Sequence, residues 1–101
     1  NKPVSAVCHG SSGLVNVKLS NGEFLISNKK MTGFSWREEE LAKRDHAVPY
    51  SLEQALKDKG ANYKKGLIPF TEKVIEDGLL ITGQNPGSSQ AVAKELLKLL
   101  A

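Results

Sequence analysis

Residues 4–15 of the chain read VSAVCHGSSGLV, and this stretch decides the fold. Its apolar beginning, residues 4–7, is typical of a strand buried in a parallel sheet. The strand ends at Cys8, the only cysteine, and His9 and Gly10 follow before small residues open an apolar helical pattern. This order predicts a strand, a sharp turn and a helix, with Cys8 at the tip of the turn in a strained backbone conformation.

Cys8 has two interpretations. A lone cysteine after an apolar run is commonly a buried, inert residue, because free cysteine packs as a small hydrophobe. At the tip of the turn, however, its sulfur would lie near a helix N-terminus, where free N–H groups and the helix dipole lower a thiol pKa toward neutrality. A populated thiolate is a nucleophile. The residues alone leave both interpretations open.

The composition bounds the class of protein. The chain has 101 residues, 40% hydrophobic and 25% charged, as expected for one globular domain. Its net charge is only +3 and its lysines are scattered among acids, which indicates a solvated surface and predicts no nucleic-acid partner. No apolar run is long enough to span a membrane, so no membrane partner is expected. One cysteine cannot form an intramolecular disulfide and suits a reducing, cytoplasmic location, and with two histidines it offers too few donors for a closed zinc site.

Apolar periodicity and turn signals predict the other elements. Helices are expected over residues 12–19, 52–59 and 86–100, one or two helical turns within 36–44, and strands over residues 24–26, 31–34 and 61–64. A hairpin over residues 74–82 turns at Asp77-Gly78. Ser35 with Glu38 and Ser51 with Gln54 predict capping boxes, and Asn85 caps the last helix. That helix carries a broad apolar stripe that needs a sheet to cover, so the pattern predicts an α/β sandwich.

The first strand also indicates what surrounds this chain. A central parallel strand needs hydrogen-bonding neighbours on both sides, and residues 4–7 have almost no sequence before them to supply one. We therefore expect residues 1–101 to be the C-terminal part of a larger domain.

A cysteine nucleophile works best with a histidine within reach and a carboxylate that orients the histidine. His9 is adjacent to Cys8, and a sharp turn can bring both side chains to one pocket. His46 is interpreted as a surface loop residue and is given no role. Glutamates at residues 38–40 follow the predicted strand 31–34, where a loop at the sheet edge would carry an acid. Taken alone, such a run of charges is usually a solvated helix start.

Three motifs together resemble the ThiJ/PfpI superfamily, with its glutamine amidotransferase-like fold, and in particular its branch of glutathione-independent glyoxalases and stress chaperones. The motifs are residues 6–10 (AVCHG), residues 32–34 (TGF) followed by acids, and residues 80–89 (LITGQNPGSS). The resemblance runs the length of the chain and implies a flavodoxin-like three-layer α/β/α sandwich that forms a homodimer. It also implies a Cys-His-Glu/Asp triad, in which Cys8 is the nucleophile, His9 its partner and Glu39 the acid. The resemblance thereby replaces the interpretation of the acidic run as a solvated helix start. Glu38 and Glu40, one residue to either side of Glu39, are the alternative positions for the acid.

The resemblance implies a glyoxalase III-type reaction, from methylglyoxal to lactate, without a metal, nucleotide or glutathione cofactor. A holding chaperone, a cysteine peptidase or amidase with the same triad, and a redox sensor that oxidises Cys8 are the alternatives. Two departures from the family pattern stand out. Ser11-Ser12 replaces the usual Pro-Ala after the Cys-His-Gly motif, and the N-terminal half is absent. By resemblance that half supplies a glutamate to the cysteine and loop amides to the oxyanion site, so it is expected as a partner, on the same chain or on a second one.

Overall fold

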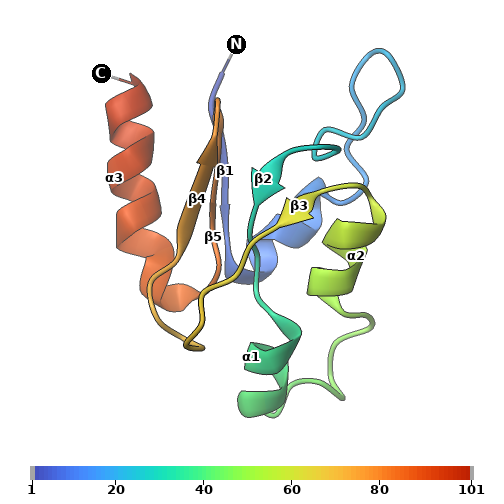
Figure 1. The fold of residues 1–101 in the computed structure, drawn as a ribbon, viewed down its shortest axis with the longest axis vertical. Helices are drawn as coiled ribbons and strands as arrows, with labels where there is room; N and C mark the ends of the chain where they lie inside the picture. Colours follow the sequence, from blue (N-terminus) through green and yellow to red (C-terminus); the bar gives the residue numbers. More distant parts are fainter. Residues whose placement is uncertain (1, 101) are drawn as a thin grey trace.

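In the computed structural model, which describes residues 2–100, the opening stretch forms the expected strand, β1 (Val4–Val7). β1 pairs in parallel with β5 (Leu80–Gly83), and β5 pairs antiparallel with β4 (Val74–Asp77), so the sheet order is β1-β5-β4 (Figure 1). β4 and β5 form the predicted hairpin, and Gly78 in its turn has a φ of +61°. Parallel pairing of β1 with β5 brings their carboxyl ends to the same edge of the sheet, where a ligand site is expected in α/β folds.

Helices cover both faces of this sheet. The last helix, α3 (Ser89–Leu100), packs on β1 and β5 from one side (Figure 1). A Cβ at Gly83 would lie 2.7 Å from a methyl group of Val92, so the close approach of α3 to β5 requires glycine there. On the other side lie the 3-10 helix η1 (Cys8–Leu14) and α2 (Leu52–Asp58), which pack against each other. The layers are those of the expected α/β/α sandwich.

A second, short parallel pair lies beside the main sheet. β2 (Lys30–Met31) pairs with β3 (Asn62–Tyr63), and β2 lies against β4 and β5. The N–H of Thr32, just after β2, donates to Oγ1 of Thr82 in β5 at 2.8 Å. The hydrophobic core lies between these strands and the η1–α2 layer. Its buried members are Val15, Ile26, Met31, Phe34, Leu52, Leu56, Ala61 and Leu80.

The predicted helix over residues 12–19 is wrong. The helical turn starts earlier, at Cys8, is a 3-10 helix and ends at Leu14. The chain then turns, and Lys18 forms an isolated antiparallel bridge with Phe24. The physical reason is the composition: two glycines, two serines and two valines between residues 10 and 17 all lower helix propensity. Leu19 is 44% exposed, so it is not part of a buried helix face.

The strand predictions are partly corrected. Residues 24–26 form no strand: apart from the Phe24 bridge they lie in turns, and Ile26 is buried in the core from a turn. The strand expected over residues 31–34 is displaced, because β2 covers residues 30 and 31 only, and the strand expected over residues 61–64 shortens to β3.

The starts of α1 and α2 are better predicted than their ends. α1 (Trp36–Leu41) has the complete capping box of Ser35 and Glu38, but the chain leaves the helix before Lys43, whose φ is +60°. Ser51 caps α2 through the N–H of Gln54, whose side chain donates to Asp58 instead of completing a box.

The last helix begins with a 3-10 turn, η2 (Pro86–Ser88), and Asn85 makes no side-chain cap there. Of the apolar stripe on α3, Val92 is buried, while Leu100 is 63% exposed. Within residues 2–100, no helix is both long enough and apolar enough to cross a membrane.

Candidate active site

Cys8 occupies the tip of a strained turn, as predicted. Its φ is +59°, in the left-handed region that residues other than glycine rarely adopt. A contact with the segment after β2 holds the turn in place, because the N–H of Phe34 donates to the Cys8 carbonyl oxygen at 3.3 Å. The cysteine is free and its side chain is half-buried. The sulfur therefore lies at the carboxyl end of β1 in a half-buried position, where the side chain also packs against the hydrophobic core.

His9 connects the sulfur to a carboxylate. Its Nδ1 lies 3.7 Å from Sγ of Cys8, and its Nε2 lies 2.9 and 3.0 Å from the two carboxylate oxygens of Glu39. The imidazole packs on Phe34, with ring centroids 4.5 Å apart. An ionised carboxylate can only accept, so Nε2 carries the hydrogen and Nδ1 of the neutral ring is left as a base facing the sulfur.

Glu39 is held in place by the start of α1. It lies in the first turn of the helix, where the dipole favours a negative charge, and its side chain is 1% exposed. His9 is the only hydrogen-bond partner of this carboxylate within residues 2–100. A buried carboxylate with a single partner fixes that partner firmly, so Glu39 orients the imidazole.

Glu38, the neighbour of Glu39, is a fully buried centre of hydrogen bonds. One carboxylate oxygen accepts from the N–H and the hydroxyl of Ser35 and from the amide of Gln84, at 2.8–3.0 Å. The other accepts from the N–H of Phe70 and the amide of Asn85, each at 2.8 Å. Burial alone would raise the pKa of Glu38, but the hydrogen bonds outweigh it and the net pKa is lowered. Glu38 thus ties α1 to the loop before β4 and to the segment after β5.

The acidic run therefore divides into three environments. Glu38 holds the backbone together, Glu39 contacts His9, and Glu40 is exposed. His46, which was given no role, has a side chain 96% exposed beside Asp45. Gln84 and Asn85 are also buried members of this region, a role that was not predicted for them. Their position directly after β5, at the same sheet edge as Cys8, was the available signal.

The expected lowering of the Cys8 thiol pKa is wrong in direction. Burial, the largest effect, raises the pKa of the thiol, and the charges of Glu38 and Glu39 raise it further. A hydrogen bond from the His9 backbone opposes them without prevailing. The predicted helix N-terminus is also only the start of a short 3-10 turn. The thiol at neutral pH is therefore mainly protonated, and its proton has to be removed by a base.

A pocket of about 180 Å³ lies beside the His9–Glu39 pair. Its other lining residues are Ser12, Val48, Pro49, Tyr50 and Leu52, mostly apolar. A site with one polar pair against an apolar wall suits a small ligand with few polar atoms. Within residues 2–100, no group of three or more histidine, cysteine, aspartate or glutamate side chains lies close enough together to hold a metal ion.

The serine at position 11, where the family pattern has proline, is accommodated without disturbing the turn. Ser11 is fully buried, and its hydroxyl donates to the carbonyl oxygen of Thr32 at 3.2 Å. The polar side chain therefore has a partner, and it links η1 to the segment after β2.

Comparisons with known proteins extend over nearly the whole chain, although no model of a known protein family matches it. A probable glutathione-independent glyoxalase of Schizosaccharomyces pombe, hsp3103, is 38% identical across 96% of this chain and 40% of its own length. Rapid Encystment Protein 24 kDa of Francisella tularensis superposes with a TM-score of 0.93 at 38% identity, over 98% of this chain and 44% of that one. Glyoxalase III of Candida albicans superposes with a TM-score of 0.85 at 31% identity, over 95% of this chain and 42% of that one.

The solved structures confirm the fold class, a flavodoxin-like α/β/α sandwich. Over nearly its whole length the chain is similar to proteins named as glutathione-independent glyoxalases, and the resemblance inferred from the motifs is confirmed. The chain spans about 40–44% of the length of these relatives, which fits the C-terminal part alone.

Proposed function

We propose that the chain carries the catalytic cysteine, histidine and glutamate of a glutathione-independent glyoxalase that converts methylglyoxal to lactate. One observation carries the proposal: His9 lies between the Cys8 sulfur, 3.7 Å from its Nδ1, and the buried Glu39 carboxylate, 2.9 Å from its Nε2. The names of the relatives support the same reaction class. The cysteine supplies the thiol itself, so the scheme requires no glutathione.

The same proposal covers the place of this chain in the complete protein. Residues 1–101 are assigned to the C-terminal part of a single domain, in a protein that acts as a homodimer on small dicarbonyl substrates. The length of the relatives supports this assignment, because each extends to more than twice the matched region. The remaining part of the domain would then complete the pocket around Cys8.

The first step joins sulfur to the aldehyde carbon. Because the thiol pKa is raised, His9 acts as the base: Nδ1 takes the Cys8 proton while the sulfur attacks, and the proton then passes to the aldehyde oxygen. Glu39 accepts the Nε2–H hydrogen bond and stabilises the imidazolium that forms. The product is a hemithioacetal on Cys8.

The second step moves one proton between neighbouring carbons. The former aldehyde carbon loses its hydrogen as a proton to His9, and the remaining electron pair forms an enediol with the ketone carbon. Return of the proton to the ketone carbon, together with transfer of the hydroxyl proton from the former aldehyde oxygen to the former ketone oxygen, gives a lactoyl thioester. One carbon is oxidised and its neighbour reduced, so no external oxidant is needed, and water hydrolyses the thioester to lactate and the free thiol.

The acidic run offers a matched pair of variants as a test. Glu39→Gln should lower kcat for methylglyoxal at least about tenfold, because an amide can donate to the imidazole and favour the wrong tautomer. Glu40→Gln removes the same charge one residue away, on an exposed side chain, and should retain the wild-type rate. Lactate formation by the complete protein is the measurement. Equal rates in the two variants would remove Glu39 from the mechanism.

We propose holding-chaperone activity as a second candidate, since the loop between β3 and β4 exposes apolar side chains. Leu67 is 102% exposed and Ile68 is 65% exposed, and such surfaces bind other apolar surfaces. A Leu67→Ser/Ile68→Ser variant should lose suppression of client aggregation, measured by light scattering. Cys8→Ser should retain that suppression while methylglyoxal turnover disappears. Loss of suppression in Cys8→Ser alone would contradict a separate binding surface.

A further inference from the structure

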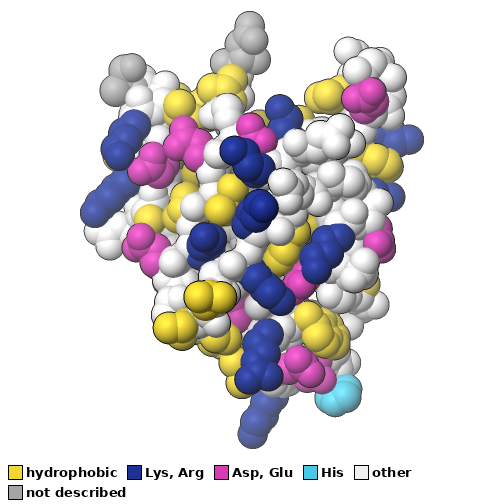
Figure 2. All heavy atoms as spheres, viewed as in Figure 1, with side chains coloured by type: hydrophobic (Ala, Val, Ile, Leu, Met, Phe, Trp, Pro, Cys, Tyr) yellow, Lys and Arg dark blue, Asp and Glu magenta, His cyan; other side chains and the backbone are white. Residues whose placement is uncertain are grey.

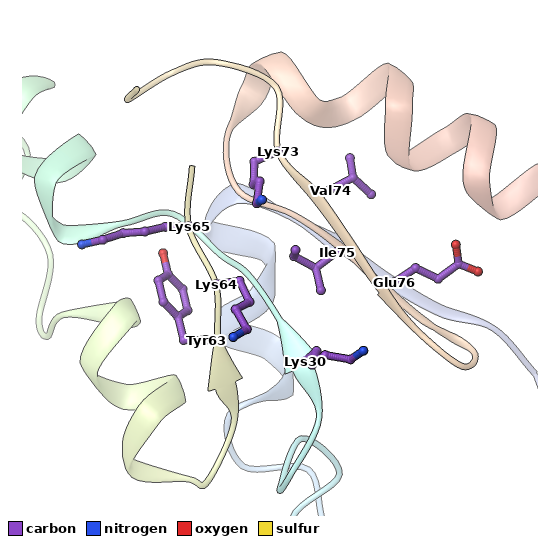
Figure 3. A pocket seen from close by; sticks show the side chains of 8 residues that line it. All are labelled: Lys30, Tyr63, Lys64, Lys65, Lys73, Val74, Ile75 and Glu76. Atoms are coloured by element: carbon purple, nitrogen blue, oxygen red, sulfur yellow. The ribbon is translucent and has the colours of Figure 1, made fainter. Parts of the chain in front are cut away.

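Four lysines line a cavity between the two sheets, although they are more than forty positions apart in the sequence at the extremes. The cavity has a volume of about 480 Å³ and is bordered by β2, β3 with the residues after it, and β4 (Figure 3). Its lining residues are Lys30, Tyr63, Lys64, Lys65, Lys73, Val74, Ile75 and Glu76. Figure 2 shows the same concentration of basic side chains over the middle of this face. Lys30, Lys64 and Lys65 are exposed, as expected for a solvated surface, but the fold brings these lysines close together at this place.

Most of this positive charge has no local counterion. Lys65 donates to the carboxylate of Glu53 at 3.3 Å. Within residues 2–100, no carboxylate oxygen lies within 4.0 Å of the ammonium groups of Lys30, Lys64 or Lys73. Glu76 is the one acidic residue in the lining, against four lysines. Asp77 adds one carboxylate nearby, because its Oδ2 accepts from the backbone N–H of Lys30 at 2.8 Å. The lysines of the cavity still outnumber the neighbouring acids, so its field is positive on balance and attracts anions.

The walls of the cavity add an apolar component. The ring of Tyr63 stands at one side, with its hydroxyl fixed by a 2.7 Å hydrogen bond to the carbonyl oxygen of Gly33. Val74 and Ile75 lie on the opposite strand, and Figure 3 shows the Ile75 side chain turned toward the lysines and that of Val74 turned to the other face. Lysine ammonium groups bind phosphate as point charges, and apolar walls accommodate the organic part of such a molecule.

We propose that this cavity binds a small organic anion with two or more negative charges, of the phosphate-ester class. A single hollow of this volume suits a small molecule, whereas a nucleic acid would need a basic stripe along the surface. The cavity shares no lining residue with the pocket beside His9 and Glu39. The inference therefore stands apart from the proposed glyoxalase reaction, and either can fail without the other.

The test compares two triple variants that lower the net charge equally. Lys30→Gln/Lys64→Gln/Lys73→Gln removes the unpaired lysines of the cavity, and Lys2→Gln/Lys94→Gln/Lys98→Gln removes three lysines outside it. ATP, inorganic pyrophosphate and adenosine are titrated calorimetrically into the complete protein, at an ionic strength of about 0.15 M where distant charges are screened.

We expect ATP and pyrophosphate to bind the wild type, with adenosine much weaker. The cavity variant should raise the Kd for both anions at least about tenfold, which corresponds to about 1.4 kcal/mol, while the control variant keeps the wild-type Kd. Methylglyoxal turnover and the thermal unfolding midpoint should stay unchanged in the cavity variant, which excludes misfolding as the cause. Absence of anion binding to the wild type, equal weakening in both variants, or adenosine binding as tightly as ATP would each overturn the proposal.

Discussion

Replacing His9 with alanine is expected to slow methylglyoxal turnover about 10²–10⁴-fold, the usual contribution of a well-placed general acid and base. The effect should be large because one imidazole serves both steps. It removes the proton of the Cys8 thiol, whose pKa is raised by burial and by two carboxylates, and it then carries the proton between the two substrate carbons. Turnover is measured as lactate formation by the complete protein. An unchanged rate would eliminate the role of His9.

Two further variants separate chemistry from stability. His9→Ala leaves the buried Glu39 carboxylate without its hydrogen-bond partner, which lowers the stability of the folded protein. His9→Gln can still donate an amide hydrogen to Glu39 but supplies no base, so it should be as slow as His9→Ala and more stable in thermal unfolding. His46→Ala removes the other histidine, whose side chain is 96% exposed, and should keep the wild-type rate.

The sequence predicted those features whose cause is local. The strand of residues 4–7, the strained Cys8 turn, the hairpin at Gly78 and the capping box of Ser35 each depend on a few neighbouring residues. A steric or hydrogen-bonding requirement within one turn can be predicted from the residue types of that turn alone. Ile26 shows the limit, because an apolar triplet predicts burial but cannot distinguish a strand from a turn that points into the core.

The functional site depended on contacts between distant residues. The contact of Glu39 with His9 spans 30 residues, and it was the family resemblance, not the spacing, that selected Glu39 from the run. The role of Glu38 was missed because its partners Phe70, Gln84 and Asn85 lie 32–47 residues away. The pKa of Cys8 was predicted with the wrong sign for a related reason: burial by the rest of the fold raises it most, and the carboxylates that raise it further come from another segment.

Glu38→Gln is expected to lower the free energy of unfolding by about 2–5 kcal/mol at neutral pH, because each buried donor left without an acceptor costs about 1–3 kcal/mol. The amide has the same shape as the carboxylate but only one accepting oxygen, so it faces the donors of either Ser35 and Gln84 or Phe70 and Asn85 with donors of its own. Glu40→Gln, on an exposed side chain, should change stability by no more than about 0.5 kcal/mol. Urea unfolding measures both, and equal stability of the two variants would contradict the hydrogen-bonding role.

Acid provides an independent check on the same carboxylate. The pKa of Glu38 is lowered in the folded protein, because its hydrogen bonds outweigh the opposing effect of burial. Its stabilisation is therefore fully present above the unfolded carboxyl pKa of about 4.3 and is lost as the pH falls through the lower folded value. The wild type should lose stability on acidification more steeply than Glu38→Gln, so the difference between them should narrow toward low pH. A difference that is independent of pH would mean that the charge of Glu38 does not contribute, and that packing alone accounts for the loss.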